Sequence, residues 1–417
     1  MSTFNDVCKV VQMIQNMKPY FDMIKSSQKR KTTYLIKDVL RMLFLACKDS
    51  NKAREEETVR MESLNGASSG NISFWKKKIV VHDAYTHMFK HTIIPASAPR
   101  VIAVDGSVIA INISSDGVKR VGKASMTLCS LLDVDSNMIV DYAISESCDE
   151  ISALRTQIIT SLQPTDLIVC DRNYGNFEFL KSINNDIRFI TRLPVHLNIV
   201  TYFKSEKKVS SIIDYNGMAV KLVRYRVDKK TKQIILDHYG ELSQKDDSES
   251  EFILATNDLT LTNIQCIDYY KQRWNIEVGF KHLKSNFDVR NPLRTYKCCD
   301  IRSYIAFPIA QSMAMYNIST YIRSIYLKTT GKSVRMTRCI AEVRGLFDKI
   351  IQDPLYSIMD SIIGFMRQFK KHLLAKPNIL NDANKDGIKN TGRYRSKMTV
   401  DTLMLQNRVY MYLVEYI

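Results

Sequence analysis

The chain has 417 residues, of which 45% are hydrophobic and 25% charged, and it carries a formal net charge of +17 at pH 7. That length is enough for two or three domains with buried cores, and the hydrophobic fraction favours a globular protein. Basic residues are spread along the chain, which favours a polyanionic partner, nucleic acid first and a membrane surface second. A merely soluble basic protein stays the alternative.

The cysteines and apolar stretches exclude several classes of protein. The nine cysteines are odd in number and form no Cys-x-x-Cys or Cys/His cluster, which predicts reduced thiols and no zinc site. No signal-peptide segment opens the chain. The longest apolar stretch, 305–315, contains Pro308 and Gln311 and is too short to cross a bilayer. We therefore expect a cytoplasmic protein without a membrane segment.

Residues 1–98 show apolar residues at helical period and predict a helical N-terminal domain. A basic cluster at Lys76–Lys78 follows Trp75, so contact with DNA is one interpretation. A packing or dimerisation domain is the equal alternative.

Residues 99–194 alternate strands and helices. In order they predict three strands (101–111, 124–134, 138–145), a helix (149–162), a strand (166–171), a helix (175–183) and a strand (188–194). This order is similar to that of the ribonuclease H-like fold, an α/β fold with a mixed sheet flanked by helices. In that fold the first strand pairs with the fourth, which by analogy would bring Asp105 and Asp171 side by side.

Asp105 and Asp171 are isolated acids in strand-like apolar runs. A carboxylate in mid-strand usually marks an edge or a turn, and that is the alternative for Asp105. The functional interpretation is that Asp105 projects from a central strand as a metal ligand, with Asp171 at the end of the fourth strand beside it.

Residues 195–252 change to alternating hydrophobicity and predict an all-β insertion. Nine Lys or Arg residues lie between 196 and 240. The hairpin tip with Lys229, Lys230 and Lys232 is a candidate phosphate contact, and a solvated edge protected by lysine is the alternative. Arg192, at the end of the fifth strand, is a weaker candidate of the same kind.

The stretch 270–284 predicts a helix with two distinct faces. Ile276, Phe280 and Leu283 recur at helical spacing and form a core stripe. The neighbouring face carries an aromatic hydroxyl, two cations and a carboxylate within roughly 60° of one another. Its members are Tyr270, Arg273, Glu277 and Lys284. A solvated face with an Arg273–Glu277 ion pair is the plain alternative.

The spacing Tyr-x2-Arg-x3-Glu-x6-Lys resembles the signature of cut-and-paste DDE transposases encoded by bacterial insertion sequences. It fixes four residues over fifteen positions, and the resemblance covers about 100–320. It implies that Glu277 is the third catalytic acid and completes a triad with Asp105 and Asp171.

The same resemblance implies that the other signature residues, Tyr270, Arg273 and Lys284, hold the phosphates around the scissile bond. Some members of the family stack a flipped base on an aromatic residue of the β insertion. The candidates for that role here are Tyr202, Phe203, Tyr225 and Tyr239.

Phosphodiester cleavage commonly uses two divalent ions held by carboxylates. Oxygen ligands suit Mg²⁺, and we expect two Mg²⁺ ions per site with Mn²⁺ as a substitute. Asp105 is the expected bridging ligand, and Asp171 and Glu277 each serve one ion.

The remaining chain is expected to complete the catalytic core at 253–326 and to form a helical C-terminal region at 327–417 for DNA contact or dimerisation. The resemblance implies a transposase that binds inverted-repeat ends, hydrolyses phosphodiester bonds and joins the 3′-OH ends to target DNA. It also implies double-stranded DNA as the partner, a homodimer in the DNA complex, and a bacterial cytoplasm with nucleoid association. The alternatives are a domesticated or inactive DNA-binding descendant and a ribonuclease H-like nuclease without strand transfer.

Overall fold

The computed structural model describes most of the middle of the chain. The described ranges are 99–114, 121–145, 149–183, 187–206, 208–215, 217–230, 234–235, 249–286, 296–297, 301–330 and most of 334–343, together with Lys9. The chain divides into two compact units, Ile93–Met313 and a second that joins Met1–Thr92 to Ala314–Ile417. The predicted N-terminal domain, apart from Lys9, and most of 327–417 lie outside the described residues.

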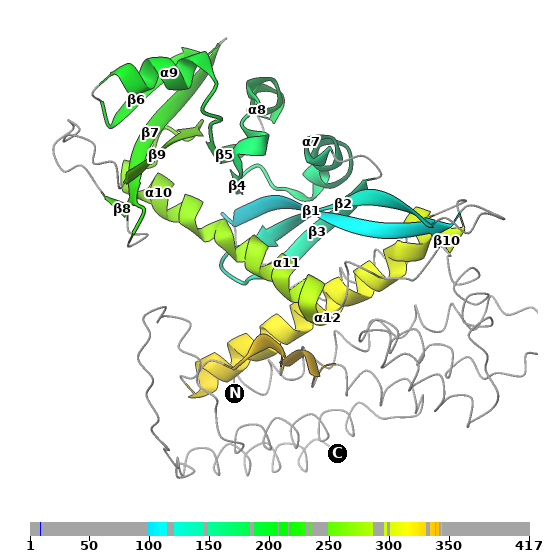
Figure 1. Cartoon of the computed structure of the whole chain (residues 1–417). Coiled ribbons are helices and arrows are strands. Elements are labelled where there is room, and N and C mark those ends of the chain that lie inside the picture. The colour runs from blue at the N-terminus through cyan, green and yellow to red at the C-terminus, as the bar shows by residue number, and fades with distance from the viewer. Residues whose placement is uncertain are drawn as a thin grey trace, which may run out of the picture. The chain divides into compact units, whose positions relative to one another are not determined.

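The described strands of the first unit form one mixed sheet (Figure 1) in the order β3-β2-β1-β4-β5-β9-β7-β6, with β10 paired to β1 and β8 to β7. The strands are β1 Val101–Ser114, β2 Val121–Asp133, β3 Met138–Ser145, β4 Leu167–Cys170, β5 Arg188–Arg192, β6 Ser210–Tyr215, β7 Met218–Asp228, β8 Ile234–Ile235, β9 Glu249–Thr256 and β10 Tyr296–Lys297.

Helices accompany this sheet in the predicted order. They are α7 Glu150–Ala153, which continues as a π turn Leu154–Ile158 and a 3₁₀ turn Ile159–Ser161, a 3₁₀ turn Arg172–Tyr174, α8 Phe177–Ile183, α9 Asn198–Ser205, α10 Asn263–Gln272, α11 Trp274–Asn286 and α12 Ile301–Thr330. The long apolar helix expected over 301–326 is confirmed as α12. None of the described helices is long and apolar enough to cross a membrane.

The first five strands have the ribonuclease H-like arrangement that their order predicts. β1, β2 and β3 form an antiparallel meander, and β1 pairs in parallel with β4, which pairs in parallel with β5. Alternate residues of β1 and β4 enter two hydrophobic cores: Ile102 and Ile168 pack with α8, while Val101 and Leu167 pack with α10. A parallel sheet buried on both faces explains why these strands read as continuous apolar runs.

The insertion extends the same sheet, because β9 lies between β5 and β7 and is antiparallel to both. The all-β prediction for 195–252 is wrong at 199–203, since these residues lie in α9. Val200 and Phe203, three positions apart, are both buried, while Thr201 and Tyr202 between them are exposed. Five residues are too few to separate a period of 2 from a period of 3.6.

The predicted signature helix is divided at Arg273, which joins α10 to α11. Its N–H donates to the carbonyl of Tyr270, and its own carbonyl accepts from the N–H of Ile276, both at 3.2 Å. Both hydrogen bonds link residues three positions apart, as in a 3₁₀ helix, so the turn around Arg273 is tighter than an α-helical turn. The backbone angles of Arg273 itself stay helical. The core stripe is confirmed, because Ile276, Phe280 and Leu283 are all buried.

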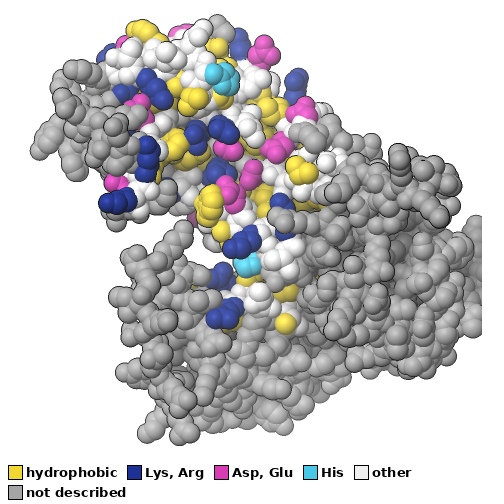
Figure 2. Space-filling model, viewed as in Figure 1, with side chains coloured by type: hydrophobic (Ala, Val, Ile, Leu, Met, Phe, Trp, Pro, Cys, Tyr) yellow, Lys and Arg dark blue, Asp and Glu magenta, His cyan; other side chains and the backbone are white. Residues whose placement is uncertain are grey.

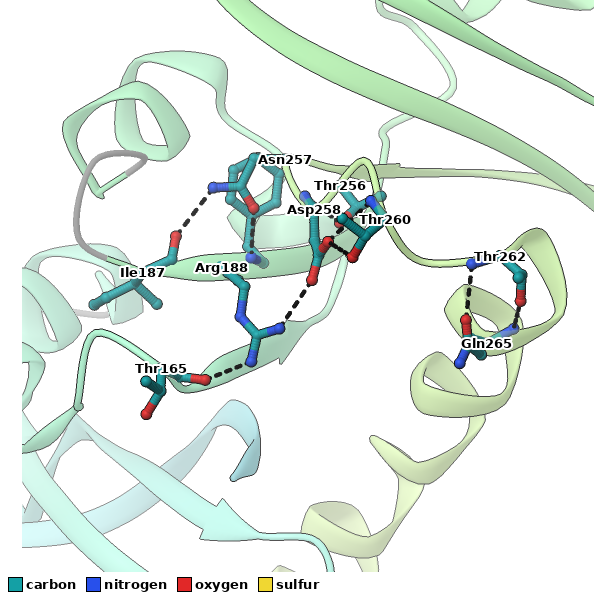
Figure 3. A network of polar contacts seen from close by, with 10 residues as sticks. Thr165, Ile187, Arg188, Thr256, Asn257, Asp258, Thr260, Thr262 and Gln265 are labelled. Carbon is teal, nitrogen blue, oxygen red and sulfur yellow. Dashed lines mark hydrogen bonds and ion pairs between the residues drawn. The ribbon is translucent and has the colours of Figure 1, made fainter. Parts of the chain in front are cut away.

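A polar network fixes the start of α10 beside β5 (Figure 3). Arg188 at the start of β5 donates to Asp258 at 2.9 Å, and Asp258 also accepts from the backbone and hydroxyl of Thr260. Burial opposes ionisation, but the hydrogen bonds from Thr260 and Arg188 outweigh it and lower the pKa of Asp258. Thr262 and Gln265 then form a capping box that begins α10. The helix that carries the signature residues is thereby anchored to the sheet.

A buried ion pair holds β1 against β4 at the end of the pair opposite the candidate acids. Arg100, just before β1, donates to both carboxylate oxygens of Asp166, just before β4, at 3.0 and 2.5 Å. Asp166 is completely buried and also accepts from the N–H of Gln163. The hydrogen bond to Asp166 raises the pKa of Arg100, against the effect of burial.

We expect Asp166→Ala to lower the free energy of unfolding by about 3–5 kcal/mol, because it leaves Arg100 partly buried without its partner. Urea unfolding followed by circular dichroism measures the change. Asp268→Ala is the matched control: Asp268 is 55% exposed and pairs with Lys271 on the surface, so its loss is worth at most about 1 kcal/mol. Equal effects of the two substitutions would contradict a special role for the buried pair.

Candidate active site

The parallel pairing of β1 with β4 brings the two candidate aspartates to the same end of the pair. The register runs from Val101 opposite Leu167 to Val104 opposite Cys170. Asp105 and Asp171 are the next residue on each strand. Asp171 then caps the following 3₁₀ turn by accepting the N–H of Arg172 at 2.5 Å, and its carbonyl accepts the Thr191 hydroxyl at 3.1 Å.

Asp105 lies inside a continuous central strand, so the alternative of an edge or turn does not hold. β1 runs without a break from Val101 to Ser114, and Asp105 is paired with Ser130 of β2. Its carboxylate accepts the N–H of Gly106 at 2.9 Å. The side chain is 17% exposed, which leaves it open to a ligand at the surface of the sheet.

Arg273 connects Asp105 to Glu277, the third candidate acid. Its Nη2 donates to Oε1 of Glu277 at 2.6 Å, and its Nη1 lies 3.8 Å from Oδ2 of Asp105. The Arg273–Glu277 ion pair, which was the alternative to a functional face, is therefore present. It is not an isolated surface pair, because Arg273 also contacts Asp105. α11 packs against β1 and β2, which brings Glu277 to the same face of β1 as Asp105.

Burial and negative neighbours make Asp105 hard to ionise. Burial raises its pKa most, the nearby charges of Glu150 and Glu277 raise it further, and Arg273 and the Gly106 N–H act in the opposite direction. The net effect raises the pKa of Asp105 to about 7. A cation that binds beside this carboxyl group would therefore stabilise its ionised form.

A second group of side chains, aromatic and cationic, lies beside the acids. The Tyr270 ring lies 5.8 Å from the Arg273 guanidinium and 6.1 Å from the Tyr225 ring. Arg192 stacks its guanidinium 4.0 Å above the ring of Phe252. Burial raises the pKa of Tyr270, and the charges of Arg273, Asp171 and Arg192 all act on it. Three candidate phosphate ligands, Tyr270, Arg273 and Arg192, are thus brought together.

The predicted lysine contacts lie farther from this group. Lys284 is on α11, seven residues beyond Glu277, or roughly 10 Å along the helix. Lys229 and Lys230 are exposed at the turn after β7, a strand that β4, β5 and β9 separate from β1. Lys232 lies outside the described residues. Figure 2 shows acidic side chains near the middle of the described surface, with Lys and Arg side chains around them.

Several residues of the insertion that looked available for DNA are structural. Arg224 and Arg226 are buried, and Arg224 donates to the carbonyls of Phe203 and Glu206. Phe203 and Tyr225 are also buried, so they offer no face for a stacked base. Of the four aromatic candidates, Tyr202 is 63% exposed and Tyr239 lies outside the described residues.

Sequence reasoning missed Glu150, the first residue of α7. Its side chain lies against Gly106, the neighbour of Asp105, and its charge acts on Asp105. An acidic residue in the first turn of a helix is common because it interacts favourably with the helix dipole, so its type gave no signal. The glycine that follows Asp105 was the available clue, since it leaves room for another side chain.

The donor set suits a hard divalent cation, although the described acids do not form a closed cage. Carboxylate oxygens are the ligands that Mg²⁺ and Mn²⁺ prefer. Within the described part of the chain, no three His, Cys, Asp or Glu side chains are close enough together to form a ready metal site. The guanidinium of Arg273 lies between two of the acids. One oxygen of Glu150, Oε2, is buried and has no hydrogen-bond partner among these residues.

We expect Asp105→Asn to stabilise the metal-free protein at neutral pH. Because folding raises the pKa of Asp105 from its ordinary value near 4 to about 7, the wild type loses stability as the pH rises across that interval. The advantage of Asp105→Asn in free energy of unfolding should therefore grow from about pH 4 to about pH 7 and then stay constant, at roughly 2–4 kcal/mol.

Urea titrations in EDTA at several pH values measure this difference between Asp105→Asn and the wild type. A difference that is independent of pH would show that Asp105 ionises normally in the folded protein.

Part of the chain matches a known protein family. Residues 96–297 match the family model described as the transposase DDE domain, and they include Asp105, Asp171 and Glu277. Among solved structures, the chain is similar to the piggyBac transposase in a cryo-EM structure of its synaptic complex with hairpin DNA. The identity is 9% and the TM-score 0.48, over 86% of this chain and 84% of that one. No curated protein sequence matches the chain. Residues 96–297 are thus similar to the transposase DDE domain.

Proposed function

We propose that this chain is a DDE transposase. It would bind the inverted-repeat ends of an insertion sequence, hydrolyse phosphodiester bonds there and join the resulting 3′-OH ends to target DNA. The observation that carries the proposal is the convergence of acids from three separate elements. Asp105 on β1 and Asp171 after β4 leave the same end of a parallel pair, and Glu277 on α11 reaches Asp105 through Arg273. The spacing of the signature residues favours a bacterial element.

In this proposal Asp105, Asp171 and Glu277 would hold two Mg²⁺ ions, with Mn²⁺ as a substitute and Asp105 as the shared ligand. The ions supply an activated oxygen nucleophile and stabilise the leaving oxygen. Burial is the main cause of the raised pKa of Asp105, and Arg273 offsets it only in part, so a cation beside this carboxylate would be stabilising. Oxygen donors from three rigid elements also suit a hard cation better than a soft one.

The residues beside the acids would bind the DNA backbone. Without DNA or metal, Arg273 pairs with Asp105 and Glu277. Once a metal ion neutralises those acids, its planar guanidinium can form two hydrogen bonds to one phosphate. Tyr270 would donate a hydrogen bond to the same phosphate, and Arg192 and Lys284 would contact neighbouring ones. The overall charge of +17 favours DNA generally, without selecting a sequence.

Assembly follows from the reaction. Two ends must be held together for a cut-and-joined product, so we propose a homodimer in the complex with double-stranded DNA. Lys229, Lys230 and Lys232, at the end of the insertion far from the acids, are proposed as contacts to DNA away from the scissile bond.

The test is strand cleavage of a labelled duplex taken from the DNA that flanks this reading frame. With Mg²⁺ we expect nicks at the element boundary and a joined product with a target duplex, and EDTA should abolish both. Glu277→Gln should lower cleavage by at least about 100-fold while leaving end binding within a few-fold, since it removes one ligand and no DNA contact.

Glu178→Gln serves as the control, because it removes one exposed acid of α8 and should leave cleavage unchanged. Binding without nicks in Mg²⁺ or Mn²⁺ would identify an inactive DNA-binding descendant. Nicks without a joined product would identify a nuclease. Normal cleavage by Glu277→Gln would remove Glu277 from the site.

A further inference from the structure

Tyr225 lies on β7 of the insertion, on the face of the sheet that α10 covers. Its side chain belongs to the hydrophobic core that also contains Leu254, and Tyr270 of α10 packs against the same core. Tyr225 is paired with Phe252 of β9, and the two rings lie 5.3 Å apart. Only 7% of Tyr225 is exposed, so neighbours from β9 and α10 fix the position of its ring.

Tyr225 is part of a series of contacts that runs from one arginine to another. Arg192, Phe252 and Tyr225 lie on β5, β9 and β7, which are neighbours in the sheet. The guanidinium of Arg192 lies 4.0 Å from the centre of the Phe252 ring. On the side of the acids, the Tyr225 ring lies 6.1 Å from that of Tyr270, which is 5.8 Å from the guanidinium of Arg273.

The hydroxyl of Tyr225 is available as a donor. It has no hydrogen-bond partner among the described residues. A buried tyrosine hydroxyl usually has a partner, because losing its contact with water is costly. Burial raises the pKa of Tyr225 strongly, so the hydroxyl keeps its proton at neutral pH. The charges of Arg192 and Arg273 both act on this hydroxyl and lower its pKa in part.

Arg192 is a cation that waits for an anion beside the acid site. No carboxylate among the described residues pairs with it, whereas Arg273 pairs with two acids. Its guanidinium is stacked on Phe252, and a stacked guanidinium keeps its N–H groups in the ring plane available for hydrogen bonds. The preceding residue, Thr191, donates to the carbonyl of Asp171 at 3.1 Å, which holds the end of β5 next to the site.

We propose that Arg192 and Tyr225 form a subsite for one backbone phosphate of DNA, next to the phosphate that Tyr270 and Arg273 would hold. This inference rests on the proposed function, because it assumes that DNA lies across the acids. Arg192 supplies the charge and Tyr225 a neutral hydrogen-bond donor, and Phe252 is a positioning residue that orients Arg192. A contact of this kind fixes the register of the DNA without reading its sequence.

The test is binding of the full-length protein in EDTA to the labelled duplex from the DNA that flanks this reading frame, followed by fluorescence anisotropy at several salt concentrations. Tyr225→Phe removes only the hydroxyl, so we expect the affinity to fall about 5-fold or more with an unchanged salt slope. Arg192→Ala should lower the affinity and also reduce the salt slope by about 1, because it removes a cation.

Tyr215→Phe is the matched control for the loss of a hydroxyl. Tyr215 lies on β6 of the same insertion but stacks on Phe177 of α8, on the opposite face of the sheet. This variant should bind the duplex like the wild type. Urea unfolding completes the comparison: Tyr225→Phe should be at least as stable as the wild type, since its hydroxyl has no partner to lose in the protein without DNA.

Double variants test whether the residues act on one phosphate. In an Arg192→Ala background, adding Tyr225→Phe should weaken binding less than it does in the wild type. Phe252→Leu should weaken binding in the wild type, and it should have little effect in the Arg192→Ala background, because Phe252 acts through Arg192.

The outcomes separate the possible failures. Wild-type affinity in Tyr225→Phe, or a loss of affinity matched by a loss of stability, would overturn the subsite and leave the proposed function intact. Additive effects of Tyr225→Phe and Arg192→Ala would overturn the shared phosphate. An equal effect of Phe252→Leu in both backgrounds would overturn its positioning role. No binding of the duplex by the wild type would overturn both this inference and the proposed function.

Discussion

The parallel ladder between β1 and β4 ends at Val104 and Cys170, and the two aspartates are the first residues beyond it. Everything else in the site is built around that ladder. The buried Arg100–Asp166 pair fixes its other end, and two hydrophobic cores bury both of its faces. Because the side-chain direction of a strand reverses at each residue, a shift of one position would turn Asp105 away from α11.

Charge sets the second constraint on this site. Three acids, Asp105, Asp171 and Glu277, lie near a single guanidinium, that of Arg273. Proteins seldom keep so much negative charge on half-buried carboxylates without a cation. Arg273 satisfies part of that need through Glu277 and Asp105, but burial still raises the pKa of Asp105. The site without a cation is thus less stable than the site with one would be, as is common where a protein binds a charged ligand.

Much of this arrangement could be predicted from the sequence, because its strands and helices are long enough to show a clear hydrophobic pattern. The apolar runs gave β1 to β5 in their order, and the stripe of Ile276, Phe280 and Leu283 gave the buried face of α11. The two isolated aspartates stood out because a charge in an apolar strand is unusual. The strand order then implied, by analogy with a known fold, that they are neighbours.

The features that escaped prediction depend on contacts between distant segments. The burial of Arg224 and Arg226 follows from β7 being an inner strand of the sheet, which no local pattern in the insertion reveals. α9 was mistaken for a strand because five residues fit both periods. Glu150 looked like an ordinary acid at a helix start until the structure placed it on Gly106.

The claim that the acids form one cation site can be tested most directly with Fe²⁺ in place of Mg²⁺. Bound Fe²⁺ with a reductant and peroxide generates hydroxyl radicals that cut the backbone near the ion, and mass spectrometry locates the cuts. We expect cuts near Asp105, Asp171 and Glu277 together, all suppressed by excess Mg²⁺ and all lost in Asp105→Asn. Cuts confined to one of these segments, or clustered elsewhere in the chain, would contradict it.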